Sequence, residues 1–202
     1  MKFILGQKIG MSEMFDKDGR FIPVTLIEAG PCYVLQQKTK EKDGYQALQI
    51  GFEKITKKKK IKKTAKGKEY RYIKEERIKV SQEQQPKVGD KIDVSVFKEG
   101  DKVKVSGISK GKGFQGSVKR CGFSGKFSSH GVKHEHRVVG SIGSRFPQRV
   151  IPGKKMPGRM GGERTTVKNL KIVKIEPENN LLVVQGAVPG RKGTLLEIRS
   201  GT

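Results

Sequence analysis

The feature that most constrains this chain is a segment, residues 107–162, in which hydrophobic periodicity disappears. Its 56 residues include 13 of the 26 glycines, all three histidines and four of the nine phenylalanines. A structureless stretch of this length is uncommon inside a compact domain unless it is functional or disordered. Aromatic, histidine and methionine residues recur between its basic residues, which a plain flexible linker does not need. The pattern predicts an arm that is ordered by a binding partner.

The residues on both sides of this segment show the short alternating patterns of β-strands. Residues 69–80 fit either a short helix or a strand. Because the arm interrupts what looks like a single module, residues 91–108 and 164–198 should share a sheet. We therefore expect a β module made of residues 1–109 and 163–202, with an extension at residues 110–162. The strands are expected at residues 3–15, 21–27, 32–37, 46–52, 92–97, 103–108, 167–175, 181–184 and 194–198.

The charge of the chain indicates a polyanionic partner. Lys and Arg total 44 against 20 Asp and Glu, which gives a net charge of +24. Nine of the lysines lie in residues 54–68 with no acid, and we interpret this part of a Lys-rich insert at 54–85 as a solvated loop. DNA, RNA and an anionic membrane all attract such a chain.

Several classes of protein are excluded by the apolar residues and the cysteines. No apolar stretch is long enough to span a membrane, the first residues do not form a signal peptide, and no strongly amphipathic helix is present. Two cysteines are too few for a disulfide framework and favour a reducing compartment. We expect a cytoplasmic protein that does not associate with membranes.

Catalytic and metal-binding patterns are incomplete. Residues 122–126 and 107–113 miss the spacing of a nucleophile elbow and of a phosphate-binding loop. We therefore expect no catalytic residue and no cofactor. Zinc would find ligands of suitable type in Cys121, His130, His134 and His136, but no Cys-x-x-Cys pair is present and the surroundings are cationic. We therefore expect no metal. Instead of binding zinc, Cys121 would be a buried thiol, and the histidines would donate to phosphates or stack on bases of RNA.

The composition of the arm suits nucleic acid. Lysine and arginine neutralise phosphates, glycine allows close approach of the backbone, and Phe114, Phe123, Phe127 and Phe146 can stack on bases. No recognition-helix pattern for a DNA major groove is present, whereas the crevices of folded RNA suit an irregular arm. RNA is therefore the expected partner.

Five blocks of sequence, in order along the whole chain, carry a family resemblance. They are GQKIGM at residues 6–11, VSGISKGKGFQG at 105–116, GSIG at 140–143, GKKMPGRMG at 153–161 and GAVPG at 186–190. Together these blocks resemble the universal ribosomal protein three family of the large ribosomal subunit, in its shorter bacterial type.

The resemblance implies both a fold and a role. The fold is a mainly β, six-stranded barrel of the kind shared by translation proteins, with a long irregular extension and one or two short helices. The role is that of a structural protein that binds large-subunit rRNA near its 3′ end, nucleates assembly and extends an arm toward the peptidyl transferase centre. The implied partners are this rRNA and the large-subunit proteins numbered fourteen and nineteen, with no homo-oligomer. An RNA-acting enzyme using His130, His134 and His136 is the rival hypothesis.

The resemblance also places the parts of the extension. Its stem corresponds to residues 110–120 and 153–162, and its tip to residues 143–147. Some bacterial members have a methylated glutamine where this chain has Ser144, so the resemblance does not extend to that modification. The residues expected to bind rRNA are Lys110, Lys112, Phe114, Gln115, Lys119, Arg120, Lys126, Phe127, His130, His134, His136, Arg137, Ser141, Ser144, Arg145, Phe146, Arg149, Lys154, Lys155, Met156, Arg159, Met160 and Arg164.

Overall fold

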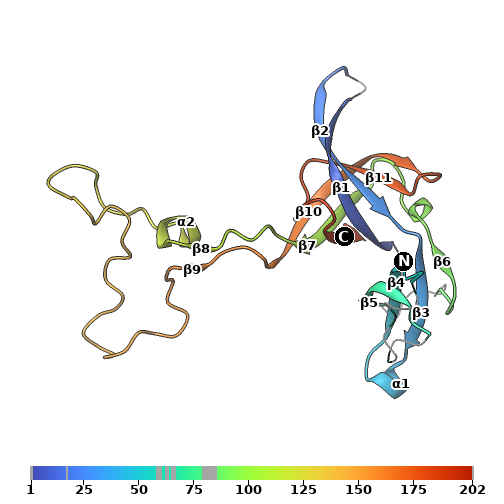
Figure 1. Cartoon of the computed structure of the whole chain (residues 1–202), viewed down its shortest axis with the longest axis horizontal. Helices are drawn as coiled ribbons and strands as arrows, with labels where there is room; N and C mark the ends of the chain where they lie inside the picture. Colours follow the sequence, from blue (N-terminus) through green and yellow to red (C-terminus); the bar gives the residue numbers. More distant parts are fainter. Residues whose placement is uncertain are drawn as a thin grey trace. The chain divides into compact units, whose positions relative to one another are not determined.

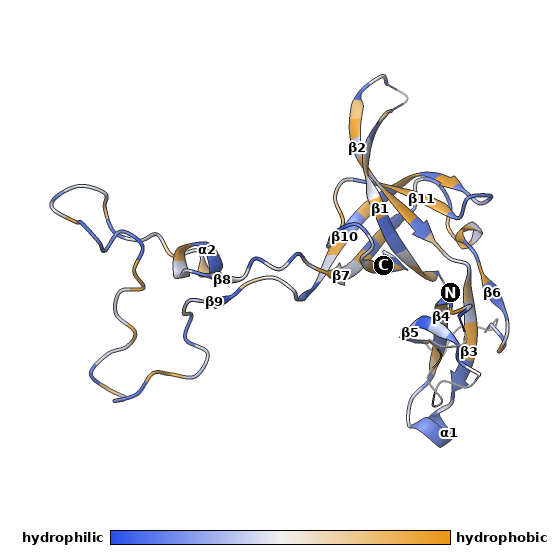
Figure 2. Cartoon of the chain, viewed as in Figure 1, coloured by the Kyte–Doolittle hydropathy of each residue, from blue (hydrophilic) through white to orange (hydrophobic). Residues whose placement is uncertain are grey.

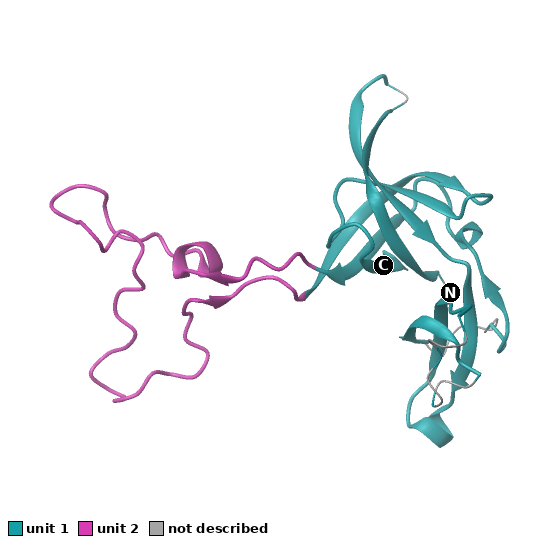
Figure 3. Ribbon diagram, viewed as in Figure 1, with its two compact units in different colours: residues 1–108, 164–202 teal, residues 109–163 magenta. Residues whose placement is uncertain are grey.

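A computed structural model describes residues 2–16, 18–57, 61, 64, 67–78 and 86–201 of the chain. The chain divides into two compact units, drawn in different colours in Figure 3. Unit 1 comprises residues 1–108 and 164–202, and unit 2 comprises residues 109–163. Much of the lysine-rich segment that the sequence predicts to be a solvated loop, including residues 58–60, lies outside the described residues.

Unit 1 is built on six antiparallel strands that close into a barrel (Figure 1). The ring closes because β1 (Phe3–Phe15) pairs with β2 (Phe21–Ala29) on one side and with β12 (Leu195–Ser200) on the other, and the remaining three strands connect β12 to β2. The expected mainly β fold with a closed six-stranded sheet is therefore confirmed. In order around the barrel the strands are β1 (Phe3–Phe15), β12 (Leu195–Ser200), β7 (Lys102–Ile108), β10 (Arg164–Glu176), β11 (Leu181–Gln185) and β2 (Phe21–Ala29).

The strands on either side of unit 2 pair with each other. Strand β7 runs antiparallel to β10, from Ile108 opposite Arg164 to Lys102 opposite Lys171. It also pairs with β12 on its other edge. The expectation that residues 103–108 share a sheet with the chain after residue 164 is thus confirmed.

A second sheet of four strands contains two departures from the sequence-based expectations. Residues 92–97 do not form a barrel strand, because Lys91–Ile92 (β6) pairs with β3 and Val94–Val96 then forms a 3₁₀ turn. The turn buries Val94 and Phe97, a spacing of three rather than the alternation of a strand. The strand order is β5 (Tyr70–Arg77), β4 (Ala47–Lys54), β3 (Cys32–Lys38) and β6, with a short helix α1 (Lys40–Asp43) between β3 and β4.

The helix alternative for residues 69–80 is wrong within its described part. Strand β5 pairs with β4 along its whole length. Between ring centroids, Tyr72 lies 6.3 Å from Phe52, its register partner on the neighbouring β4, and Tyr70 lies 5.9 Å from Tyr33 on β3, one strand further across the sheet. Such cross-strand aromatic pairs stabilise a sheet, so the period of two prevails over the alternating charges that suggested a helix.

The barrel and the second sheet share one hydrophobic core. Ile4 and Leu5 at the start of β1 are fully buried, as are Ile198 on β12 and Leu48 and Ile50 on β4. Cys32 also lies in this core, and burial raises the pKa of its thiol to about 12. It is therefore a protonated packing residue.

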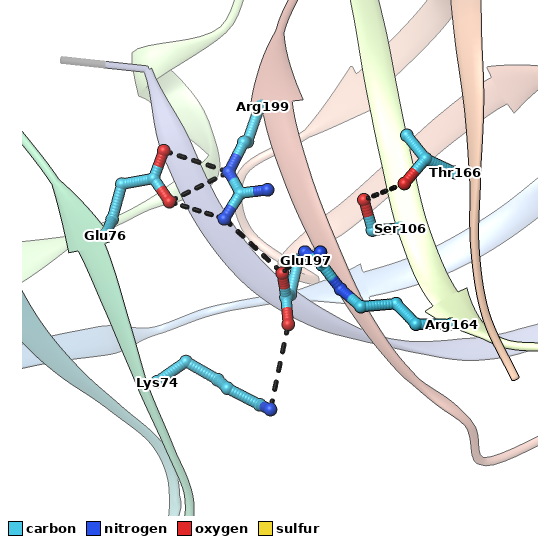
Figure 4. A network of polar contacts seen from close by, with 7 residues as sticks. All are labelled: Lys74, Glu76, Ser106, Arg164, Thr166, Glu197 and Arg199. Carbon is cyan, nitrogen blue, oxygen red and sulfur yellow. Dashed lines mark hydrogen bonds and ion pairs between the residues drawn. The ribbon is translucent and has the colours of Figure 1, made fainter.

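A polar network also joins the second sheet to the barrel (Figure 4). The Arg199 guanidinium on β12 donates from Nε and Nη2 to the Glu76 carboxylate on β5, at 2.5 to 2.9 Å. Glu197, two residues earlier, accepts from Arg164 on β10 at 2.5 Å and lies 3.8 Å from Lys74 on β5. The network gives the sheet a bidentate, directional attachment in addition to apolar contact.

Two glycines on β1 provide a matched test of how closely the barrel strands are packed. A Cβ on Gly6 would lie 2.7 Å from the Glu28 carbonyl oxygen and 3.1 Å from the Ala29 Cα, both fixed backbone atoms. A Cβ on Gly10 would meet only the flexible end of Lys192, at 3.4 Å. We predict that Gly6→Ala lowers the free energy of unfolding by about 1–3 kcal/mol, and that Gly10→Ala changes it by about 0.5 kcal/mol or less. Urea denaturation of both variants measures this, and equal stabilities would contradict the packing described.

Candidate nucleic-acid interface

Unit 2 begins and ends as a narrow two-stranded stem. The amide of Ser109 donates to the Glu163 carbonyl at 2.9 Å, and the amide of Lys112 donates to the Met160 carbonyl at 2.9 Å. Strand β8 (Phe114–Gln115) then pairs with β9 (Gly158–Arg159). Gly161, at φ 74°, lies so close to the Lys110 carbonyl that a Cβ would overlap it. Glycine is therefore what allows the two sides of the stem to approach.

One arginine fastens the end of the stem. Arg120 lies on the short helix α2 (Ser117–Cys121), which ends at Gly122 in a left-handed conformation. Its Nε donates to the Arg159 carbonyl at 3.1 Å, and its Nη1 donates to the Met156 carbonyl at 2.5 Å. These bonds join residues 36 and 39 positions apart in the sequence. Arg120 therefore crosslinks α2 to the returning strand.

Beyond the stem, residues 126–136 form a closed loop that carries the histidines. The Lys126 amide donates to the His136 carbonyl at 3.1 Å, and the Lys126 ammonium pairs with the Glu135 carboxylate. Nδ1 of His136 lies 3.2 Å from the Phe127 carbonyl. The ammonium lowers the pKa of the Glu135 carboxyl, so the acid remains ionised and compensates one lysine of the loop. His130 and His134 stay exposed.

Almost nothing in unit 2 is buried. Among residues 109–163, all of which the structure describes, Ser117 is the one buried residue, and residues 140–155 are exposed without exception. Figure 2 shows apolar and polar residues intermixed along this unit. The Phe114, Phe127 and Phe146 side chains are 76%, 83% and 70% exposed. Twelve Lys and Arg stand against two acids in this unit, so its surface combines positive charge with bare aromatic rings.

Comparison with known proteins identifies the family. A family model described as "Ribosomal protein L3" matches residues 28–180, a range that includes all of unit 2. The large ribosomal subunit protein uL3 of Carboxydothermus hydrogenoformans is 51% identical over 98% of this chain and 96% of its own length. The proteins of the same name from Thermosipho africanus and a Geobacillus species are each 49% identical, over 99% and 98% of this chain and 98% and 96% of their own lengths. The chain belongs to the ribosomal protein L3 family.

In this L3-family protein, most residues that the sequence assigns to RNA binding carry exposed side chains. Partial burial is confined to Gln115, His136, Met156 and Met160. Arg120 is exposed but uses donors within unit 2, and Arg164 belongs to unit 1, where it pairs with Glu197. Their contribution to RNA binding stays a prediction, like that of the other residues.

The possible zinc ligands are not brought together. Within the described part of the chain, no group of three or more His, Cys, Asp or Glu side chains could hold a metal ion. Cys121 is half-buried rather than buried, and its thiol lies 3.6 Å from the Met156 carbonyl. The suggestion that Cys121 is a buried thiol is therefore wrong, because unit 2 has no core in which to bury it. No helix among the described residues is long and apolar enough to cross a membrane.

Sequence reasoning overlooked the exposed aliphatic residues of unit 2. Val138, Ile142, Val150 and Ile151 are 42%, 45%, 41% and 58% exposed. The charged and aromatic residues of this segment are the ones whose chemistry indicates RNA binding, and these aliphatic side chains carry no such signal. A useful signal would have been any branched aliphatic residue in a segment that lacks periodicity, since such a residue has no core of its own chain to enter.

The stem provides a test of whether Arg120 organises unit 2. We predict that Arg120→Leu speeds amide hydrogen exchange at Lys112 and Met160, because their hydrogen bonds lie in the stem that the guanidinium fastens. Lys119→Leu, the adjacent exposed cation of α2, loses the same charge and should leave this exchange unchanged. An equal loss of protection in the two variants would show that charge, and not the Arg120 hydrogen bonds, governs the stem, and unchanged protection in Arg120→Leu would show that Arg120 does not fasten it.

Proposed function

We propose that this protein is a structural constituent of the large ribosomal subunit that binds large-subunit rRNA directly, with unit 2 as its RNA-binding arm. As a member of the ribosomal protein L3 family, it has the role of a large-subunit protein. The curated relatives carry the name "Large ribosomal subunit protein", which supports this role. The contact with rRNA and the function of unit 2 are the finer parts of the proposal.

One observation carries the assignment of unit 2: it has many exposed cations and rings but only one buried residue. Fixing a residue's backbone costs about 1–2 kcal/mol, so ordering 55 residues costs on the order of tens of kcal/mol. Burial within unit 2 offsets little of this. Phosphate neutralisation, base stacking and close backbone approach by RNA would supply the missing contacts.

The family resemblance extends this proposal to a location. We propose that the protein binds near the 3′ end of the rRNA, nucleates subunit assembly, and brings residues 143–147 toward the peptidyl transferase centre. Large-subunit proteins fourteen and nineteen are its proposed neighbours.

The rival function is an RNA-acting enzyme that uses His130, His134 and His136. The exposure of His130 and His134 gives it no enclosed site in which to exclude water from a reaction. An enzyme would turn over RNA with the isolated chain and lose that activity in His130→Ala or His134→Ala. A structural protein binds stoichiometrically without turnover.

The salt dependence of RNA binding tests the arm quantitatively. If unit 2 neutralises on the order of ten phosphates, the plot of log K against log salt should have a slope of roughly −7 to −9. Removing residues 140–152 deletes Arg145 and Arg149. That deletion should make the slope shallower by about 1.4 to 1.8. Filter binding to large-subunit rRNA over a range of salt concentrations measures both slopes. A slope that the deletion leaves unchanged would show that residues 140–152 do not contact the RNA phosphates.

The same deletion separates folding from assembly. We predict that the chain lacking residues 140–152 keeps its urea unfolding midpoint, because those residues contribute no buried side chain. Large subunits that contain it should assemble slowly or be less active. In the free full-length chain, trypsin should cut first at Lys126, Arg137, Arg145 or Arg159, and rRNA should protect these sites. A deletion that unfolds the barrel would place the arm in the core and contradict our division of the chain.

A further inference from the structure

The hairpin formed by β1 and β2 extends beyond the barrel. Pairing of β1 with β12 ends at Gln7, and pairing of β2 with β11 ends at Val24. Beyond these points β1 and β2 pair with each other as far as Phe15 opposite Phe21, and the Gly186 amide, just past β11, donates to the Pro23 carbonyl at 2.8 Å. Figure 1 shows this ribbon rising past the other strands of the barrel. We call residues 9–23 the hairpin tip.

The hairpin tip holds most of the exposed large hydrophobic residues in the described part of unit 1. Ile9, Met11, Phe15 and Phe21 are 44%, 54%, 68% and 55% exposed. They are four of the six exposed large hydrophobic residues in the described part of unit 1. An isolated two-stranded ribbon is at best marginally stable, and exposed apolar side chains on it gain no burial free energy within this chain. Such a cluster is typical of a surface that another molecule covers.

The two phenylalanines are arranged as a fixed pair. Phe15 and Phe21 lie opposite each other in the register, with ring centroids 4.5 Å apart and planes at 79°. Because side chains alternate along a strand, Met11 lies on the same face as Phe15. Pro23, two residues from Phe21, lies on that face too. This face therefore carries Met11, Phe15, Phe21 and Pro23, and Glu13, the register partner of Pro23, lies on it between Met11 and Phe15.

The charge of the hairpin tip differs from that of the rest of the chain. It contains Glu13, Asp16 and Asp18 against Lys17 and Arg20, a net charge of −1, in a chain whose net charge is +24. Unit 2, by contrast, has a net charge of +10. A surface intended for phosphates would gain from cations, and acids there would repel the polyanion. The tip therefore matches a cationic partner.

We propose that the hairpin tip is a docking surface for a basic protein of the same ribosomal particle. An apolar side chain of that partner packs against the Phe15–Phe21 pair, and its flanking Lys or Arg residues face Glu13 and Asp18. Acidic side chains thus flank the Phe15–Phe21 pair along the hairpin, with Glu13 on the same face and Asp18 in the connection between the two strands, so complementary cations on both sides of an apolar contact suit this surface. The proposal rests on the ribosomal role proposed above, and it assigns the tip to protein and unit 2 to RNA.

Photocrosslinking in purified large subunits tests this assignment. The full chain is prepared with p-benzoylphenylalanine in place of Phe21 and, separately, in place of Phe146 of unit 2. After irradiation, the Phe21 position should crosslink to a peptide of another large-subunit protein whose flanking residues carry net positive charge. Crosslinking to rRNA, crosslinking to an acidic segment, or no crosslink would overturn the proposal. The Phe146 position should crosslink to rRNA, and its failure alone would count against the RNA role of unit 2 and leave the hairpin proposal standing.

Charge reversal tests the complementarity. In the Phe21 crosslinker background, Glu13→Lys together with Asp18→Lys should reduce the yield of protein crosslink by about threefold or more. Glu41→Lys together with Asp43→Lys, on the exposed helix α1, changes the net charge of the chain equally and should preserve the yield. An equal loss of crosslink yield in the two double variants would overturn the proposal, because a change in the net charge of the chain would then explain the effect. Urea unfolding midpoints of the two double variants show whether the barrel is intact in each.

Discussion

The antiparallel pairing of Ile108 with Arg164 is the constraint on which the rest of this structure depends. It brings together two residues separated by the 55 residues of unit 2, so that a long insertion begins and ends at one point of the barrel wall. The hydrogen bonds from Ser109 to Glu163 and from Lys112 to Met160 continue that pairing into the stem. The barrel can therefore carry a segment that has no core without losing its own strand order.

The two units differ in the proportion of their positive charge that acids within the same unit can compensate. In unit 1, several cations have partners within the unit: Arg199 pairs with Glu76, Arg164 with Glu197, and the buried Lys8 ammonium donates to the carbonyls of Val188 and Gly190 at 3.0 and 3.2 Å. In unit 2, twelve cations face two acids. Unit 1 still carries a net charge of +14, from 32 Lys and Arg against 18 Asp and Glu, but the excess of cations over acids is proportionally far greater in unit 2 and leaves charge there for another molecule to neutralise.

The strands of the barrel were predictable because each is a local pattern of alternating residues, and the family resemblance supplied their closure. Residues 92–97 were misassigned because the burial of Phe97 follows a 3₁₀ spacing that depends on packing against the core. The choice between helix and strand at residues 70–77 depended on rings contributed by β3 and β4, which no local pattern contains. In unit 2, residue type pointed to RNA, but the use of Arg120 as an internal crosslink follows from contacts with residues 36 and 39 positions away.

The position of β1 between β2 and β12 has a consequence for the order in which the molecule can form. Synthesis completes unit 2 at residue 163, when β10, β11 and β12 have still to be made. Until residues 195–199 emerge, the edge of β1 that β12 will occupy has no strand beside it. At roughly 5–20 residues per second, this interval lasts about 2 to 7 s. During that time the highly cationic unit 2 is already exposed to nucleic acid, while only three of the six strands of the barrel that carries it have been synthesised.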